Sequence, residues 1–233
     1  MDTALLEAVR SGDRRALSRA ITQVEQGGAE TGLPTPEKVI GITGPPGAGK
    51  STLISGLIDV IRDRGETVAV LAVDPSSPVT GGAMLGDRIR MQSHADDDGV
   101  YVRSMATRGQ LGGLAPATQE TVALLGLAGF DRLVVETVGV GQSEVEVMDL
   151  ADIVVLVVGP SWGDQVQADK AGIVEIAHVF VVNKGDRPGG SDVKRALRET
   201  ADARDVQVLL TTATTGVGVP ELLDEIDRLV DGS

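Results

Sequence analysis

The sequence predicts an α/β fold: a doubly wound, mainly parallel sheet with helices on both faces. Short runs of Val, Ile and Leu alternate along the chain with helical stretches, which is the order of βαβ units. At least one run, at residues 153–158, is apolar on both faces, as strands buried in a parallel sheet are. The 233 residues suffice for one large domain. Because 42% of them are hydrophobic and only 2% are aromatic, we expect an aliphatic core.

We expect the elements in the following order. The chain opens with helical residues 4–26, interrupted at residues 11–13, where Asp13 is placed to cap the second helix. Residues 27–36 have the composition of a linker, so residues 1–36 form an N-terminal helical extension and residues 37–233 the main domain. Strands are expected at residues 39–43, 67–73, 100–104, 132–136, 153–158, 179–182 and 206–210, and helices at 51–64, around 87–93, 116–127 and 219–230; Asp96–Asp98 is expected to be a solvated turn.

Composition excludes several classes of protein. The chain has no cysteine and only two histidines, His94 and His178, which excludes disulfides and Cys-ligated metals and makes a multi-histidine centre improbable. A net charge of −13 weighs against a nucleic-acid-binding surface, and it fits salt adaptation and high-GC coding bias about equally. No apolar run reaches the roughly 18 residues of a membrane span. Residues 1–10 are acidic and amphipathic, unlike a signal peptide, so we expect a cytoplasmic protein with no membrane partner.

The octapeptide GPPGAGKS fits the pattern G-x-x-x-x-G-K-[ST] of a phosphate-binding P-loop, and it lies between an expected strand and helix, as that motif requires. Glycines allow the backbone amides to turn toward phosphate oxygens, and the helix N-terminus adds positive potential. Lys50 can reach the β- and γ-phosphates, Ser51 can ligate Mg²⁺, and Thr52 can support the α-phosphate. The expected phosphate-binding residues are Gly44, Pro45, Pro46, Gly47, Ala48, Gly49, Lys50, Ser51 and Thr52.

A second motif, NKGD, follows the strand at 179–182, about 130 residues after the P-loop. The carboxylate of Asp186 can accept hydrogens from N1 and the exocyclic amine of guanine, a donor pair that adenine lacks, and this selects GTP over ATP. Asn183 completes the motif, and the stem of Lys184 can cover the base. Thr212-Ala213-Thr214, after the last strand, resembles the loop whose backbone meets the guanine carbonyl, although an ordinary turn explains it equally well.

Ser51 and three carboxylates are expected to form a Mg²⁺ site. The tetrapeptide ETVG at residues 136–139 ends a strand and fits [DE]-x-x-G, in which the carboxylate of Glu136 holds Mg²⁺ through water and the Gly139 amide senses the γ-phosphate. Asp74 ends the strand at 67–73, which we expect beside the P-loop strand, and Asp87 lies in a glycine-rich stretch. The alternative roles are a helix or turn cap for Asp74 and a helix N-cap for Asp87.

Three long segments and the NKGD loop resemble the methylmalonyl-CoA mutase-associated GTPase family (MeaB/ArgK/MMAA type). They are VDPSSPVTGGAMLGDRIRM, RSMATRGQLGGLA, ETVGVGQSEVEVMDLAD and the NKGD loop, and the resemblance runs from residue 13 to about residue 219. It implies a P-loop GTPase that uses GTP/GDP and Mg²⁺ to gate cofactor loading of an adenosylcobalamin-dependent mutase and to release damaged cofactor. On this resemblance Asp74, Asp87 and Glu136 are the metal and switch carboxylates.

The resemblance also implies a third switch at GPSWGDQVQADKAG, in which Asp164, Gln167 and Lys170 link the nucleotide to the partner; their alternative is an exposed loop and helix start. Better-known members of the family continue with a C-terminal helical arm that dimerises. Since this sequence ends at Ser233, we expect a monomer or a partner-dependent dimer rather than dimerisation through that arm.

Catalysis and alternative functions remain open at this point. Many GTPases carry, directly after D-x-x-G, a glutamine that orients the attacking water, whereas this chain has Val140, with Gln142 nearby. We therefore expect slow basal hydrolysis that a partner stimulates, with Lys50, Glu136 and Lys170 as the catalytic residues. The alternatives are a kinase acting on a lysine/arginine/ornithine transport protein, a metal-insertion GTPase, and a nucleotide-gated binding module with negligible turnover.

Overall fold

The computed structural model of the chain describes residues 1–27, 31–34, 36–74, 94, 96–106, 114–137, 148–164, 173–201 and 206–232. Within these residues lies a seven-stranded sheet in the order β3-β2-β4-β1-β5-β6-β7, and every neighbouring pair of strands is parallel. The strands are β1 (Val39–Thr43), β2 (Val68–Asp74), β3 (Val100–Ala106), β4 (Arg132–Thr137), β5 (Ile153–Val158), β6 (Val179–Val182) and β7 (Gln207–Leu210). The predicted α/β fold and all seven predicted strands are confirmed.

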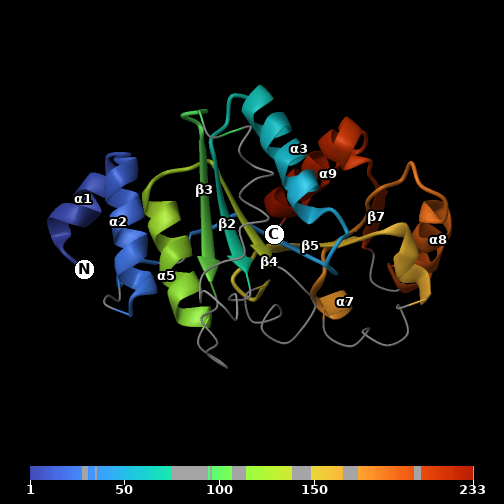
Figure 1. Ribbon diagram of the computed structural model, residues 1–233, viewed down its shortest axis with the longest axis horizontal. Coiled ribbons are helices and arrows are strands. Elements are labelled where there is room, and N and C mark those ends of the chain that lie inside the picture. Colours follow the sequence, from blue (N-terminus) through green and yellow to red (C-terminus); the bar gives the residue numbers. More distant parts are fainter. Residues whose placement is uncertain are drawn as a thin grey trace.

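Helices cover both faces of the sheet (Figure 1). On β5, Ile153, Val155 and Val157 belong to one buried cluster with α3 (Lys50–Asp63) and α9 (Val219–Asp231). The alternate residues of β5 face the other way: Val154 joins the cluster of α2 and α5, and Leu156 joins the cluster of α8. This alternation is that of a sheet packed on both sides, so the fold is doubly wound. The other helices among the described residues are α1 (Thr3–Arg10), α2 (Arg14–Glu25), α5 (Leu114–Leu127), α7 (Ile173–Ile176) and α8 (Gly190–Ala201), with short 3₁₀ turns η2 (Pro160–Asp164) and η4 (Ala213–Thr215).

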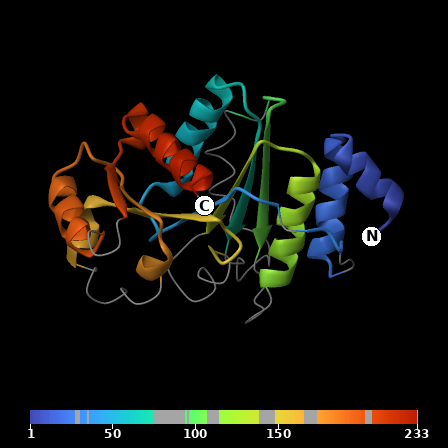
Figure 2. The same ribbon diagram turned by 180° about the vertical axis from the view of Figure 1, so that it is seen from behind.

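The two N-terminal helices pack beside the β3 end of the sheet (Figure 2). Asp13 caps α2 as predicted, since its Oδ1 accepts hydrogen bonds from the amides of Arg15 at 2.8 Å and Ala16 at 3.0 Å. These amide bonds hold the pKa of Asp13 below its usual range. Helix α2 packs against α5, and its Ser18 hydroxyl lies 3.1 Å from the Tyr101 hydroxyl of β3. The extension therefore shares a hydrophobic core with the sheet.

Because of this shared core, we predict that Ile21→Ala destabilises the main domain. Ile21 is fully buried, and removing its side chain leaves a cavity that should lower the free energy of unfolding by about 2–5 kcal/mol. Chemical denaturation followed by circular dichroism measures the change. Gln23→Ala, on the exposed side of the same helix, should change stability by less than about 0.5 kcal/mol. An unchanged main transition for Ile21→Ala would show that the extension folds separately.

Two sequence-based expectations change. Helix α8 and the short helix α7 were not predicted, although Val193, Leu197 and Ala201 of α8 form a buried stripe at helical spacing. The Asp96–Asp98 turn is more than a solvated one, because Arg62 Nε lies 2.9 Å from Asp97 Oδ2. This hydrogen bond, with one from the Gly99 amide, lowers the pKa of Asp97.

No helix among the described residues is long and apolar enough to cross a membrane.

Candidate nucleotide-binding site

The P-loop connects the carboxyl end of the central strand, β1, to the start of α3. Strand β1 lies where the strand order reverses direction, and the carboxyl end of that position is where open α/β sheets bind ligands. Gly44 and Gly49 have φ angles of +143° and +94°, and a Cβ on Gly44 would collide with the carbonyl oxygen of Val157. Both positions therefore require glycine, and the loop takes the tight turn that the motif predicts.

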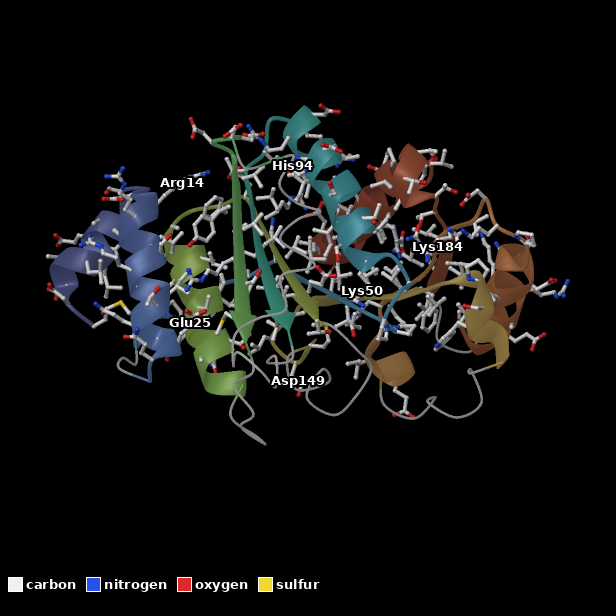
Figure 3. The ribbon with its side chains drawn as sticks, viewed as in Figure 1. Arg14, Glu25, Lys50, His94, Asp149 and Lys184 are labelled. Carbon is white, nitrogen blue, oxygen red and sulfur yellow. The ribbon has the colours of Figure 1, made fainter. Side chains whose placement is uncertain are left out.

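Lys50 and Ser51 begin α3 and are both buried. Lys50 Nζ donates to the carbonyl oxygens of Gly44 at 2.8 Å and Pro45 at 3.3 Å, so the ammonium group lies over its own loop (Figure 3). Ser51 Oγ donates to Glu136 Oε1 at 3.0 Å, which joins the P-loop helix to the end of β4. Both oxygen-bearing side chains are under 5% exposed. The predicted pairing of Ser51 with Glu136 is thus present in the structure.

The donor set suits a hard divalent cation. A serine hydroxyl and a carboxylate are ligands that Mg²⁺ accepts, and their proximity at the mouth of the P-loop would let them hold the ion directly or through water. Among the residues that the structure describes, no group of three or more His, Asp or Glu side chains forms a metal site on its own. The pair therefore fits a Mg²⁺ whose other ligands are water and nucleotide phosphate.

The expected position of Asp74 needs correction. Strand β2 pairs with β3 and β4, and β4 lies between β2 and the P-loop strand β1. Asp74 therefore ends a strand two positions from β1, whereas Glu136 ends the strand directly beside it. The expectation placed β2 directly beside β1 because β2 follows β1 in the sequence. In the structure β4, which comes later in the sequence, lies between them. Asp87 lies outside the described residues.

Asn183 fastens the NKGD loop to the P-loop. Its buried side chain donates from Nδ2 to the carbonyl oxygens of Ala48 at 3.0 Å and Gly49 at 3.3 Å. Its Oδ1 accepts from the Thr211 hydroxyl and the Ala213 amide, each at 3.1 Å. One amide side chain therefore holds together the three loops that follow β1, β6 and β7.

Lys184 makes a second connection. It has a φ of +61°, which is uncommon outside glycine, and its Nζ donates to the Gly47 carbonyl oxygen at 2.6 Å. The Gly185 amide donates to the Thr211 carbonyl at 2.9 Å, which sets the loop against the end of β7. Asp186 is exposed at the tip of this loop. The phosphate-binding loop and the expected guanine-binding loop thus form one continuous site.

The family model described as "Methylmalonyl Co-A mutase-associated GTPase MeaB" matches residues 5–232. The chain belongs to this family. It is 48% identical to a putative GTPase of Pyrococcus horikoshii, over 95% of this chain and 75% of that protein. It is 38% identical to the mouse protein named methylmalonic aciduria type A homolog, mitochondrial, over 79% of this chain and 47% of that one.

A solved structure agrees with this assignment. The crystal structure of a protein titled "LAO/AO transport system kinase" superimposes with a TM-score of 0.74 at 27% identity, covering 98% of this chain and 76% of that one. The hydrogenase maturation factor HypB of Archaeoglobus fulgidus, at 20% identity and a TM-score of 0.63, shares the fold. The family match and the relatives named as GTPases make this member of the MeaB family a P-loop GTPase, a class of enzyme that binds GTP and GDP.

Several of the expected site residues cannot be placed. Gly139, Gln167 and Lys170 lie outside the described residues, and Asp164 ends η2 without a described side chain. The sequence reasoning missed Thr211, a fully buried residue whose hydroxyl bonds Asn183. A threonine directly after the last strand was the available signal, because strand ends at this edge of the sheet converge on the ligand.

For this MeaB family member we predict that Asn183→Ala loosens the site as a whole. The change leaves the partly buried Ala213 amide and the buried Thr211 hydroxyl without their acceptor, which should cost about 2–4 kcal/mol of stability. GTP affinity should fall as well, because the loops are no longer held in register. Differential scanning fluorimetry with and without GTP measures both effects. Thr215→Ala, at an exposed hydroxyl of the same loop, should leave both nearly unchanged.

Proposed function

We propose that this protein is a GTP-hydrolysing chaperone that gates adenosylcobalamin loading of a methylmalonyl-CoA mutase and helps release damaged cofactor. The observation that supports the nucleotide part is the Asn183 side chain, which holds the phosphate loop and the NKGD loop at hydrogen-bonding distance from each other. The family match over residues 5–232 supports the choice of partner.

The geometry supports the following roles for the residues. Asp186 accepts the two guanine N–H donors, the Lys184 stem covers the base, and the loop at Thr212–Thr214 faces the guanine carbonyl. The amides of residues 47–51 surround the phosphates; Pro45 and Pro46 have no N–H and only shape the loop. Lys50 exchanges its bonds to the Gly44 and Pro45 carbonyls for phosphate oxygens. Ser51 and Glu136 would hold Mg²⁺, which neutralises charge on the phosphates when it is bound.

In the reaction, water attacks the γ-phosphorus and the bond to the bridging β,γ-oxygen breaks, giving GDP and inorganic phosphate. The position after the E-x-x-G pattern carries valine, which cannot orient the water, so basal turnover should be slow. We propose that the mutase completes the site and thereby accelerates hydrolysis, with Gly139 and the segment of Asp164, Gln167 and Lys170 as the switches.

The decisive experiment measures phosphate release from GTP by the pure protein, alone and with a purified methylmalonyl-CoA mutase. We expect the mutase to raise the rate at least about tenfold, and transfer of adenosylcobalamin to the mutase to depend on the nucleotide present. Equal rates with and without every mutase tested would contradict the proposal. Recovery of the γ-phosphate on a protein, rather than as free phosphate, would instead support a kinase.

A further inference from the structure

A second cleft lies against the outer side of the P-loop. It has a volume of about 400 Å³, within the size range of ligand pockets, and three segments line it. They are residues 45–48 of the P-loop, residues 159–162 at the start of η2, and Lys184 with Arg187 and Pro188 after β6. A ligand in this cleft would therefore touch both nucleotide-binding loops from outside.

This cleft is distinct from the guanine nucleotide site. The cleft is not lined by Lys50, Ser51, Asn183, Asp186 or the loop at residues 212–214, all of which are expected to contact the nucleotide or its Mg²⁺. The shared residues are Pro45–Ala48 and Lys184. Lys184 stands between the two sites, because its Nζ donates to the Gly47 carbonyl while its side chain also borders the cleft.

The charge of the cleft is opposite to that of the chain. The protein carries a net charge of −13, yet the described residues that line the cleft include two cations, Lys184 and Arg187, and no carboxylate. Helix α8 begins at Gly190, directly after this segment, and its N-terminus adds positive potential. An anionic group is therefore the natural ligand of this surface.

The walls of the cleft indicate what carries the anion. Pro45, Pro46, Pro160 and Pro188 contribute rigid apolar surface, and so does Trp162, which is 4% exposed and belongs to the buried cluster of α8. Among the described lining residues, Ser161 and the indole N–H of Trp162 supply the only uncharged polar side-chain groups. A nucleobase would find few side-chain hydrogen-bonding partners here, whereas an aliphatic stem that ends in a carboxylate matches both the walls and the cations.

We propose that this cleft binds an acidic side chain, flanked by apolar residues, from the protein partner of the GTPase. The identity of the partner rests on the proposed function; the chemistry of the cleft does not. Because Lys184 borders both sites, binding of the carboxylate and binding of the nucleotide are coupled, and each changes the affinity for the other by the same factor.

Binding in the cleft can be followed by tryptophan fluorescence, because the single tryptophan of the chain, Trp162, lines the cleft. The GDP-loaded protein is titrated with acetyl-Leu-Glu-Leu-amide, and Trp162 fluorescence is followed. We expect a saturable change that the matched peptide acetyl-Leu-Gln-Leu-amide does not produce. Arg187→Glu should abolish the change, whereas Arg195→Glu should retain it. The Arg195→Glu variant carries the same charge reversal on α8, at a residue that is exposed and does not line the cleft.

The outcomes separate clearly. The proposal fails if the two peptides give the same signal, if Arg187→Glu responds as the wild type does, or if inorganic phosphate at the same concentration gives the full signal. In a second arm, the same two variants are titrated with methylmalonyl-CoA mutase, and Arg187→Glu should bind it about tenfold more weakly than Arg195→Glu. If the mutase binds neither variant nor the wild type, the proposed function fails, and the peptide titration still decides the role of the cleft.

Discussion

Lys50→Ala is expected to lower the rate of GTP hydrolysis by about 100- to 1,000-fold, the usual cost of removing one donor that stabilises transition-state charge. Lys50 is buried at the start of α3, and its ammonium group is held against the Gly44 and Pro45 carbonyls of the P-loop. Single-turnover release of phosphate, with GTP above its dissociation constant, measures the effect.

A matched control makes the result specific. Lys194→Ala removes the same charge from helix α8, where desolvation lowers the pKa of the partly buried ammonium group, and hydrolysis should stay within about twofold of the wild type. The melting temperature of Lys50→Ala should be close to that of the wild type or above it, because the variant removes a buried charge. Hydrolysis that persists in a folded Lys50→Ala protein would place the catalytic charge elsewhere.

Asp186→Asn is expected to weaken GTP binding by about 100-fold and to transfer the preference to xanthosine triphosphate. In the proposed binding mode the carboxylate of Asp186 accepts two hydrogen bonds from guanine. Asparagine replaces one of these acceptors with an NH₂ donor that faces a guanine N–H, which costs about 3 kcal/mol. Xanthine has a carbonyl group in place of the exocyclic amine, so an amide side chain donates to that oxygen and still accepts from N1. Calorimetric titration of both nucleotides with magnesium measures the exchange.

The control for this prediction is Asp192→Asn. Asp192 is also exposed, lies six residues further on in α8, and pairs with Arg195 at 2.8 Å on the surface. Its neutralisation should leave both affinities unchanged. Equal affinity of the Asp186→Asn protein for GTP and xanthosine triphosphate, both at the wild-type GTP level, would exclude Asp186 from base recognition.

The elements that the sequence predicted well are those whose chemistry is local. The P-loop and the NKGD loop combine glycines, a lysine and an amide at fixed spacing, and the backbone conformation of each follows from these residues alone. The strands were found because Val, Ile and Leu runs are buried on both faces in β1, β5 and β6. The Ser51–Glu136 pair was predicted from two such local motifs, each at the carboxyl end of a strand.

The elements that were missed depend on contacts between distant parts of the chain. The position of β4 between β1 and β2 comes from strand pairing, which no local pattern encodes, and it moved Asp74 away from the P-loop strand. The fourfold bonding of Asn183 joins residues up to 135 positions apart, so the motif indicated a nucleotide-binding asparagine but not a structural link. Helix α8 was not predicted, because it begins with Gly190 and its apolar stripe is narrow.

The packing of α2 also bears on how the chain folds during synthesis. Its contacts with the sheet join residues far apart in sequence: 83 positions separate Ser18 from Tyr101, and 78 separate Glu25 from Arg103. Helix α2 leaves the ribosome before its partners, because β3 and α5, which bury its apolar side, lie about 75 to 100 residues further along the chain. Until those residues are translated, the side chains of Leu17 and Ile21, which are buried in the folded protein, stay exposed to water, so the hairpin of α1 and α2 folds fully only after β3 and α5 have been made.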